Sequence, residues 1–205
     1  MSQITHGLRA IFSSPCIYDS FQNLMGASRI RRELVSNHIR PKPGMRVLDI
    51  GCGTAEIVAF LPEGVDYWGC DISEQYIDAA KVRFGTRGNF KCGLLDAQQV
   101  DLLPQFDLVI ALGVLHHLDD AEASSLFELA KRALKTDGRV VTIDPCFAHD
   151  QNLIARFLID RDRGQNVRTA EAYRALPGSN FSRIEGQLRH RSWIPYTHWL
   201  MECTQ

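Results

Sequence analysis

The stretch Val47-Leu48-Asp49-Ile50-Gly51-Cys52-Gly53-Thr54-Ala55 decides the fold of this chain. The run that ends at Ile50 is short and apolar, which favours a buried strand. Gly51 and Gly53 then form a tight turn, where a backbone bends sharply or a ligand comes close. The apolar residues from Thr54 onward predict a helix. A strand, a glycine turn and a helix form the ligand-binding corner of an open α/β sheet, although the same order also occurs as an ordinary connection.

A carboxylate follows at the end of the next predicted strand, residues 65–71. Asp71 comes about twenty residues after the turn, where a nucleotide-binding sheet places an acid that accepts hydrogen bonds from a ribose diol. A dinucleotide fingerprint requires a third glycine at the position of Glu56. Glu56 instead brings bulk and negative charge to the place of a pyrophosphate. The sequence therefore favours an adenosyl ligand without phosphate.

Four motifs, taken in their order along the chain, resemble those of a known family. They are the glycine turn, Asp71, Asp96 and the run from Phe106 to Leu118 that contains His116-His117. Together they resemble the class I S-adenosylmethionine (SAM) dependent methyltransferases, over about residues 40–146. The usual third glycine of the loop is Ala55 here, which places a methyl group in the loop.

The resemblance implies SAM as the cofactor and S-adenosylhomocysteine (SAH) as the product. It implies that the glycine turn contacts the methionine part, that Asp71 binds the ribose hydroxyls and that Asp96 meets the adenine amino group. Ile72 is expected against the adenine ring, with core packing as the alternative. The complete set of expected cofactor residues is Tyr18, Asp49, Gly51, Cys52, Gly53, Asp71, Ile72, Tyr76, Asp96, Ala97, Ala111 and Leu112.

Composition excludes several classes of protein. The 205 residues are 45% hydrophobic and 23% charged, which is typical of one globular domain. The net charge of -1 gives no general attraction to nucleic acid or anionic membranes. The six cysteines have no metal-binding spacing, and several lie beside predicted strands, so they are interpreted as small buried residues. With no signal-peptide pattern or membrane span, we expect a cytoplasmic protein.

The order of the predicted elements gives the fold class. Strand and helix patterns alternate with short turns as far as residue 146, which predicts a doubly wound, Rossmann-like sheet that is mostly parallel. Two late strands, residues 181–190 and 197–204, match an antiparallel C-terminal hairpin, which makes seven strands with helices on both faces. We expect one domain made of an N-terminal helical lid (1–40), a SAM-binding core (41–146), a helical cap insertion (147–181) and the C-terminal strands (182–205). Tyr18 in the lid fits a cofactor cover, but core packing is the usual role of aromatic residues at helical spacing.

The histidines that follow the fourth and fifth strands are the candidates for chemistry. Methyl transfer mainly requires an acceptor held in line and protected from water. A base is needed where the acceptor is a hydroxyl group. His117, His116 and His149 are the candidate acid/base or acceptor residues, with Asp144 beside them, and each histidine also fits a structural role. The acidic pairs fit helix caps, so no metal is expected.

The sequence leaves the acceptor open. A small molecule methylated at oxygen, nitrogen or carbon is expected, such as a sugar, a lipid precursor or a natural-product intermediate. The rival hypotheses are a SAM-binding protein without turnover and a nicotinamide-dependent oxidoreductase. We expect neither a nucleic-acid nor a membrane partner, and the sequence does not indicate the oligomeric state.

Overall fold

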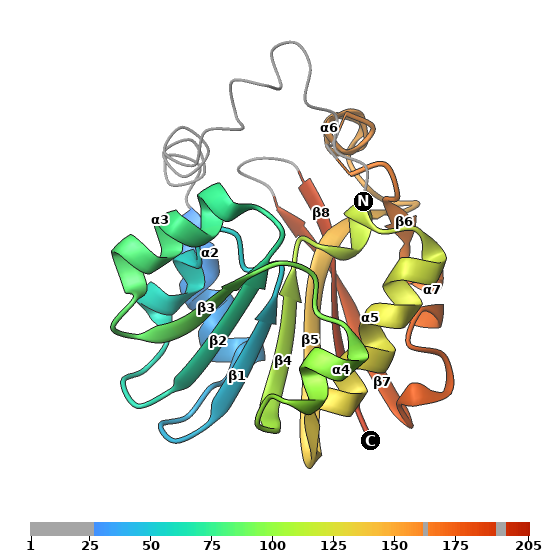
Figure 1. Ribbon diagram of the computed structural model, residues 1–205. Coiled ribbons are helices and arrows are strands. Elements are labelled where there is room, and N and C mark those ends of the chain that lie inside the picture. The colour runs from blue at the N-terminus through green and yellow to red at the C-terminus, as the bar shows by residue number, and fades with distance from the viewer. Residues whose placement is uncertain (1–26, 162–163, 192–195) are drawn as a thin grey trace. The chain divides into compact units, whose positions relative to one another are not determined.

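The computed structural model describes residues 27–161, 164–191 and 196–205 (Figure 1). These residues form two compact units that divide between Leu95 and Asp96. We call the part before this division the first unit and the part after it the second unit. The expectation of a single domain stays a prediction.

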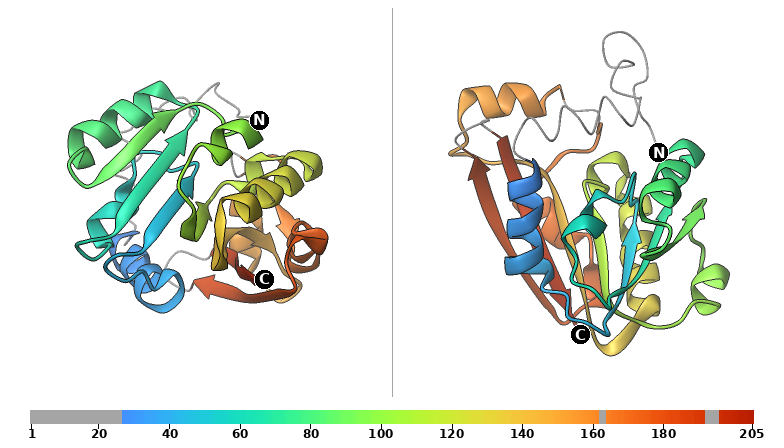
Figure 2. Two further views of the ribbon diagram at one scale, coloured as in Figure 1. Left: turned by 60° about the horizontal axis from the view of Figure 1, so that its bottom comes forward. Right: turned by 90° about the vertical axis from the view of Figure 1, so that its left-hand side faces the viewer.

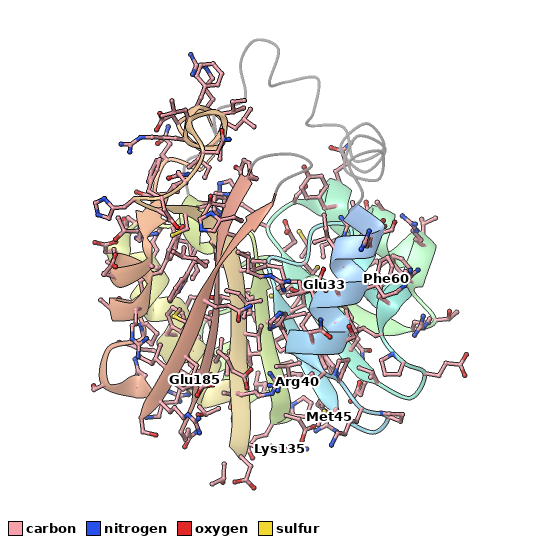
Figure 3. The ribbon with its side chains drawn as sticks, turned by 180° about the vertical axis from the view of Figure 1, so that it is seen from behind. Glu33, Arg40, Met45, Phe60, Lys135 and Glu185 are labelled. Atoms are coloured by element: carbon pink, nitrogen blue, oxygen red, sulfur yellow. The ribbon has the colours of Figure 1, made fainter. Side chains whose placement is uncertain are left out.

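The first unit is a three-stranded parallel sheet with helices on both faces. The strand order is β3-β2-β1, with both neighbouring pairs parallel. Helices α2 and α3 lie on opposite faces of these strands (Figures 1 and 2). Figure 3 shows α2, which carries Glu33, in front of the strands. The elements are α2 (Ala27–Leu34), the π-helical turn η2 (Val35–Ile39), β1 (Arg46–Ile50), the 3-10 helix η3 (Glu56–Phe60), β2 (Asp66–Asp71), α3 (Glu74–Phe84) and β3 (Gly88–Cys92).

The second unit is a mixed sheet in the order β4-β5-β8-β7. Strands β4 and β5 are parallel, while β8 is antiparallel to both β5 and β7. The two-residue strand β6 pairs with the end of β5. The elements are α4 (Ala97–Asp101), β4 (Phe106–Leu112), η4 (Leu115–His117), α5 (Asp120–Ala133), β5 (Leu134–Phe147), α6 (Leu153–Ile159), β6 (Arg168–Thr169), α7 (Ala170–Ala175), η5 (Gly178–Asn180), β7 (Arg183–Arg191) and β8 (Tyr196–Thr204).

Local sequence signals explain where the helices begin. The Ser73 hydroxyl accepts a hydrogen bond from the backbone N–H of Tyr76 and so caps α3. Asp119 and Glu122 form a reciprocal capping box at the start of α5. Each cap satisfies backbone donors that a first helical turn leaves without an intrahelical partner. The apolar face of α5 buries Leu126 and Phe127 in the core.

The predicted fold class is confirmed, because parallel strand pairs predominate and the C-terminal strands form an antiparallel pair. Three details differ. The helix expected from Thr54 is a 3-10 helix that begins at Glu56, since Ala55 has φ 55° and interrupts a regular start. Strand β5 begins at Leu134, whereas the sequence predicts a helix as far as Lys135, a turn at residues 136–138 and a strand only from Arg139. The two-residue strand β6 has no counterpart among the expected strands.

None of the helices in the described part of the chain is both long enough and apolar enough to cross a membrane.

Candidate functional site

The glycine turn after β1 is built by backbone geometry. Gly51 and Gly53 have φ values of 74° and 55°, a region that glycine enters without the steric cost of a side chain. The backbone N–H groups of Gly51 and Cys52 both donate to the carbonyl of Cys70 on β2, at 2.8 and 3.0 Å. The turn is therefore anchored to the end of the neighbouring strand.

Asp71 ends β2 and is held by two backbone donors. The N–H of Gly53 donates to Oδ2 at 2.9 Å, and the N–H of Ser73 donates to Oδ1 at 2.9 Å. Each carboxylate oxygen can accept a further hydrogen bond. Asp71 thus connects the glycine turn to the start of α3 and can also receive hydroxyl donors.

Asp49 lies in β1 and is almost fully buried, with 2% of its surface exposed. The Tyr67 hydroxyl donates to its Oδ2 at 2.6 Å, while its Oδ1 is buried and has no hydrogen-bond partner. Burial, the largest cause, raises the pKa of Asp49 to about 7, against the lowering effect of the Tyr67 hydrogen bond. We call Asp49, the turn 51–53 and Asp71 the cofactor corner.

The expected adenine contact Ile72 and the expected cofactor residue Tyr76 lie beside Asp71. Ile72 follows it with 48% of its surface exposed, and Tyr76 is half-buried in the first turn of α3. Core packing was the alternative for Ile72, and its exposed side chain does not belong to the core. An apolar surface next to Asp71 is therefore available to a planar ring.

The structure modifies the argument from Glu56. Its side chain is buried and paired with Arg83 of α3. This ion pair compensates the charge that was expected to repel a pyrophosphate, so that electrostatic argument was wrong in part. The bulk of Glu56 in place of a glycine remains.

The second unit brings together two of the expected catalytic residues. His116 Nδ1 donates to Asp144 Oδ1 at 2.9 Å, and the backbone N–H of His116 approaches the same oxygen at 3.2 Å. Both residues are buried, with 6% and 1% of their surfaces exposed. The carboxylate therefore fixes the tautomer and the orientation of the imidazole ring.

The guanidinium of Arg168 holds the backbone around the two histidines. It donates to the carbonyls of Leu115 and Leu118, each at 2.8 Å, and to the carbonyl of Asn166 at 2.9 Å. It also pairs with Asp120 at 2.8 Å. We call residues 114–118 the histidine turn. Its carbonyls are bound by a planar fork of donors that a lysine could not reproduce.

The remaining expected residues occupy several elements of the second unit, except for Tyr18. His117 is half-buried in the histidine turn, and its ring centroid is 4.0 Å from that of His116. His149 is exposed. The pKa of the nearby Glu171 is lowered mainly by backbone and Thr169 hydrogen bonds and least by the charge of His149. Asp96 caps α4 by accepting from the N–H of Gln99 at 2.7 Å, and Ala97 begins that helix. Ala111 and Leu112 end β4, whereas Tyr18 lies outside the described residues.

Sequence reasoning missed two residues of these clusters. Tyr67 carried a usable signal, because a tyrosine inside a buried strand needs a partner for its hydroxyl. Arg168 carried none, since its partners at Leu115 and Leu118 lie 53 and 50 positions away. No group of three or more histidine, cysteine or acidic residues suited to a metal occurs in the described ranges.

Comparison with known proteins identifies the domain. Residues 48–140 match the model of a methyltransferase domain family. The chain is 29% identical over 123 residues to the cyclopropane-fatty-acyl-phospholipid synthase of Escherichia coli, covering 57% of this chain and 30% of that protein. It is 27% identical over 124 residues to a ubiquinone biosynthesis O-methyltransferase of Idiomarina loihiensis, covering 58% of this chain and 50% of that protein. The chain thus spans half or less of the length of these relatives.

A solved structure shares the fold. Magnesium protoporphyrin IX methyltransferase from Synechocystis, solved with bound SAH, superimposes with a TM-score of 0.64 at 18% identity, over 90% of this chain and 84% of that one. At this identity the likeness shows the Rossmann-like fold alone. The chain thus contains a methyltransferase domain match over residues 48–140, and its fold agrees with that of a methyltransferase solved with SAH.

Proposed function

We propose that this protein transfers a methyl group from SAM to a small-molecule acceptor. The observation that carries the proposal is the cofactor corner, where two carboxylates with free accepting capacity flank a glycine turn. SAM offers a ribose diol and an ammonium group as donors to such carboxylates. The buried Oδ1 of Asp49 lacks a partner, and an ammonium group would satisfy it. The residues present therefore fit the cofactor.

Each residue of the corner has a proposed role. Asp71 accepts hydrogen bonds from the ribose hydroxyls, and Asp49 faces the amino group of the methionine part. The turn 51–53 lets the backbone approach that part closely, because its glycines carry no side chain. Ile72 and Tyr76 cover the adenine ring. Asp96, Ala97, Ala111, Leu112 and Tyr18 remain predicted contacts.

The bound sulfonium supplies an electrophilic methyl group with a good leaving group, so the protein needs mainly to position the acceptor. We infer that His117 contacts the acceptor and accepts its proton where the acceptor is a hydroxyl. His116 is buried and bonded to Asp144, which suits an anchor for its neighbour. His149 is the remaining candidate.

For the methyl acceptor we propose a range of small molecules and not a single compound. Sugars, lipid precursors and natural-product intermediates, methylated at oxygen, nitrogen or carbon, are the candidates. The names of the two relatives include a phospholipid and ubiquinone, which supports lipid-related acceptors among these. The cytoplasmic location and the absence of nucleic-acid and membrane partners stay predictions.

Binding calorimetry with SAM, SAH and NAD, followed by a panel of acceptors, tests the proposal. We expect SAM and SAH to bind and NAD not to bind. Binding of NAD in preference to SAH would support an oxidoreductase and overturn the proposal. Binding of SAM without turnover on any acceptor would favour a SAM-binding protein.

A variant tests the role of His117 once an acceptor is found. His117→Ala should lower the turnover number by about tenfold or more, the usual scale of a lost acid/base group, while SAH affinity stays unchanged. Equal turnover in this variant would leave His117 as scaffold.

A further inference from the structure

The ring of Tyr67 lies in a slot between two glycines of the first unit. A Cβ atom built on Gly69 would lie 3.1 Å from Cε1 of this ring, and one built on Gly88 would lie 2.8 Å from its Cδ1. Both distances are closer than side-chain atoms normally approach. Since Gly69 lies opposite Asp49 across the β1–β2 pair, the phenol passes over Gly69 and reaches the carboxylate. The two glycines therefore leave room for this one ring orientation.

The hydrogen bond between Tyr67 and Asp49 divides the two carboxylate oxygens. Oδ2 accepts from the hydroxyl at 2.6 Å, whereas Oδ1 is buried without a partner. A short bond from a hydroxyl to a carboxylate is charge-assisted and favours the ionised form. It also limits rotation of the carboxylate, so that Oδ1 keeps a fixed direction.

The other groups described around Asp49 in the first unit do not take the place of the Tyr67 hydroxyl as a donor to its carboxylate. Asp71 is close enough to raise the pKa of Asp49 by its like charge. The thiols of Cys52 and Cys70 stay neutral, because burial raises the pKa of both well above its ordinary value. The Cys70 thiol donates to the backbone carbonyl of Asp49 and not to the carboxylate. Burial likewise raises the pKa of Tyr67, so its hydroxyl remains a donor.

We propose that Tyr67 is a positioning residue that keeps Asp49 ionised and directs its Oδ1 toward the amino group of the cofactor. The inference rests on the proposed function, because it assumes that the cofactor corner binds SAM or SAH. It adds that recognition of the cofactor's amine depends on a phenol in the neighbouring strand. The amine is recognised only where Asp49 has lost its proton.

Calorimetry with two ligands tests this inference. SAH carries the amine, while methylthioadenosine has the same nucleoside and thioether without the amino acid. Between pH 5.5 and 8.5 we expect SAH affinity to rise with pH and methylthioadenosine affinity to stay constant. Tyr67→Phe should weaken SAH about tenfold near neutral pH and move the midpoint of its pH profile up by about one unit, the scale of one charge-assisted hydrogen bond. It should leave methylthioadenosine unchanged.

Phe90→Leu is the matched control, because the Phe90 ring contacts that of Tyr67 with centroids 5.8 Å apart but lacks a hydroxyl. An unchanged SAH profile in Tyr67→Phe, or equal losses for both ligands, would overturn the inference. Failure of the wild type to bind either ligand would instead overturn the proposed function.

A carbon-13 NMR titration of the Asp49 carboxyl gives a readout that needs no variant. In the wild type, addition of SAH should shift the titration of Asp49 to lower pH, because the bound amine stabilises the carboxylate. An unchanged titration on SAH binding would contradict the inference, even if Tyr67→Phe failed to fold.

Discussion

The cofactor corner and the histidine turn use hydrogen bonds in opposite directions. In the corner, backbone N–H groups donate to Asp71, and each carboxylate oxygen can accept a further hydrogen bond. In the turn, the guanidinium of Arg168 donates to backbone carbonyls and to Asp120. The corner is thus arranged to receive donors from outside, whereas the turn is arranged to keep its own shape. Variants of the two should separate into binding defects and stability defects.

Loss of Arg168 should produce the largest effect. Arg168→Ala leaves the buried carbonyls of the turn without donors, and we expect the free energy of unfolding to fall by about 3 kcal/mol or more. Urea unfolding measures this change. Arg156→Ala is the control, because Arg156 is exposed on α6 and its loss should cost less than about 0.5 kcal/mol. Equal stability of the two variants would mean that Arg168 does not hold the turn.

Loss of Asp71 should affect binding most. Asp71→Ala removes the proposed ribose acceptor, and SAH binding measured by calorimetry should weaken by about 1.5–3 kcal/mol. Asp66→Asn is the matched control, because Asp66 begins the same strand and is paired with Arg46. Near-unchanged affinity in Asp71→Ala would contradict the ribose assignment.

The same contrast explains what the sequence could predict. The corner follows local rules, because a glycine turn and an acid at the next strand end occupy the same edge of a parallel sheet. The caps at Ser73 and Asp119 are local in the same way, since capping acts over three residues. Arg168 lies within the region of the predicted cap insertion, and its bonds to backbone carbonyls leave no pattern in residue types. Long-range contacts to backbone atoms are the part that the sequence does not encode visibly.

The buried carboxylate of Asp49 should lower the stability of the fold when it is ionised. Its pKa rises from 3.8 to about 7 on folding, so the folded state holds more protons than the unfolded state between these values. Its contribution to stability therefore decreases as pH rises through this window. Asp49→Asn removes the buried charge, and we expect it to gain about 1–2 kcal/mol at pH 8 and nothing at pH 4.

Unfolding in urea at the two pH values measures the gain, and calorimetry should show weaker SAH binding by the same variant. Asp78→Asn, at an exposed position of α3, controls for a change in net charge. A loss of stability at pH 8 in Asp49→Asn would mean that the ionised carboxylate is favourable in the fold without its ligand.

His149 should give the smallest effect. It is exposed beside the end of β5, and its described electrostatic partner is the exposed Glu171. His149→Ala should change the free energy of unfolding by less than about 0.5 kcal/mol, because it removes no buried contact. With an identified acceptor, its turnover should equal that of the wild type, in contrast to His117→Ala. A tenfold loss of turnover in His149→Ala alone would transfer the acid/base role from the histidine turn to this exposed residue.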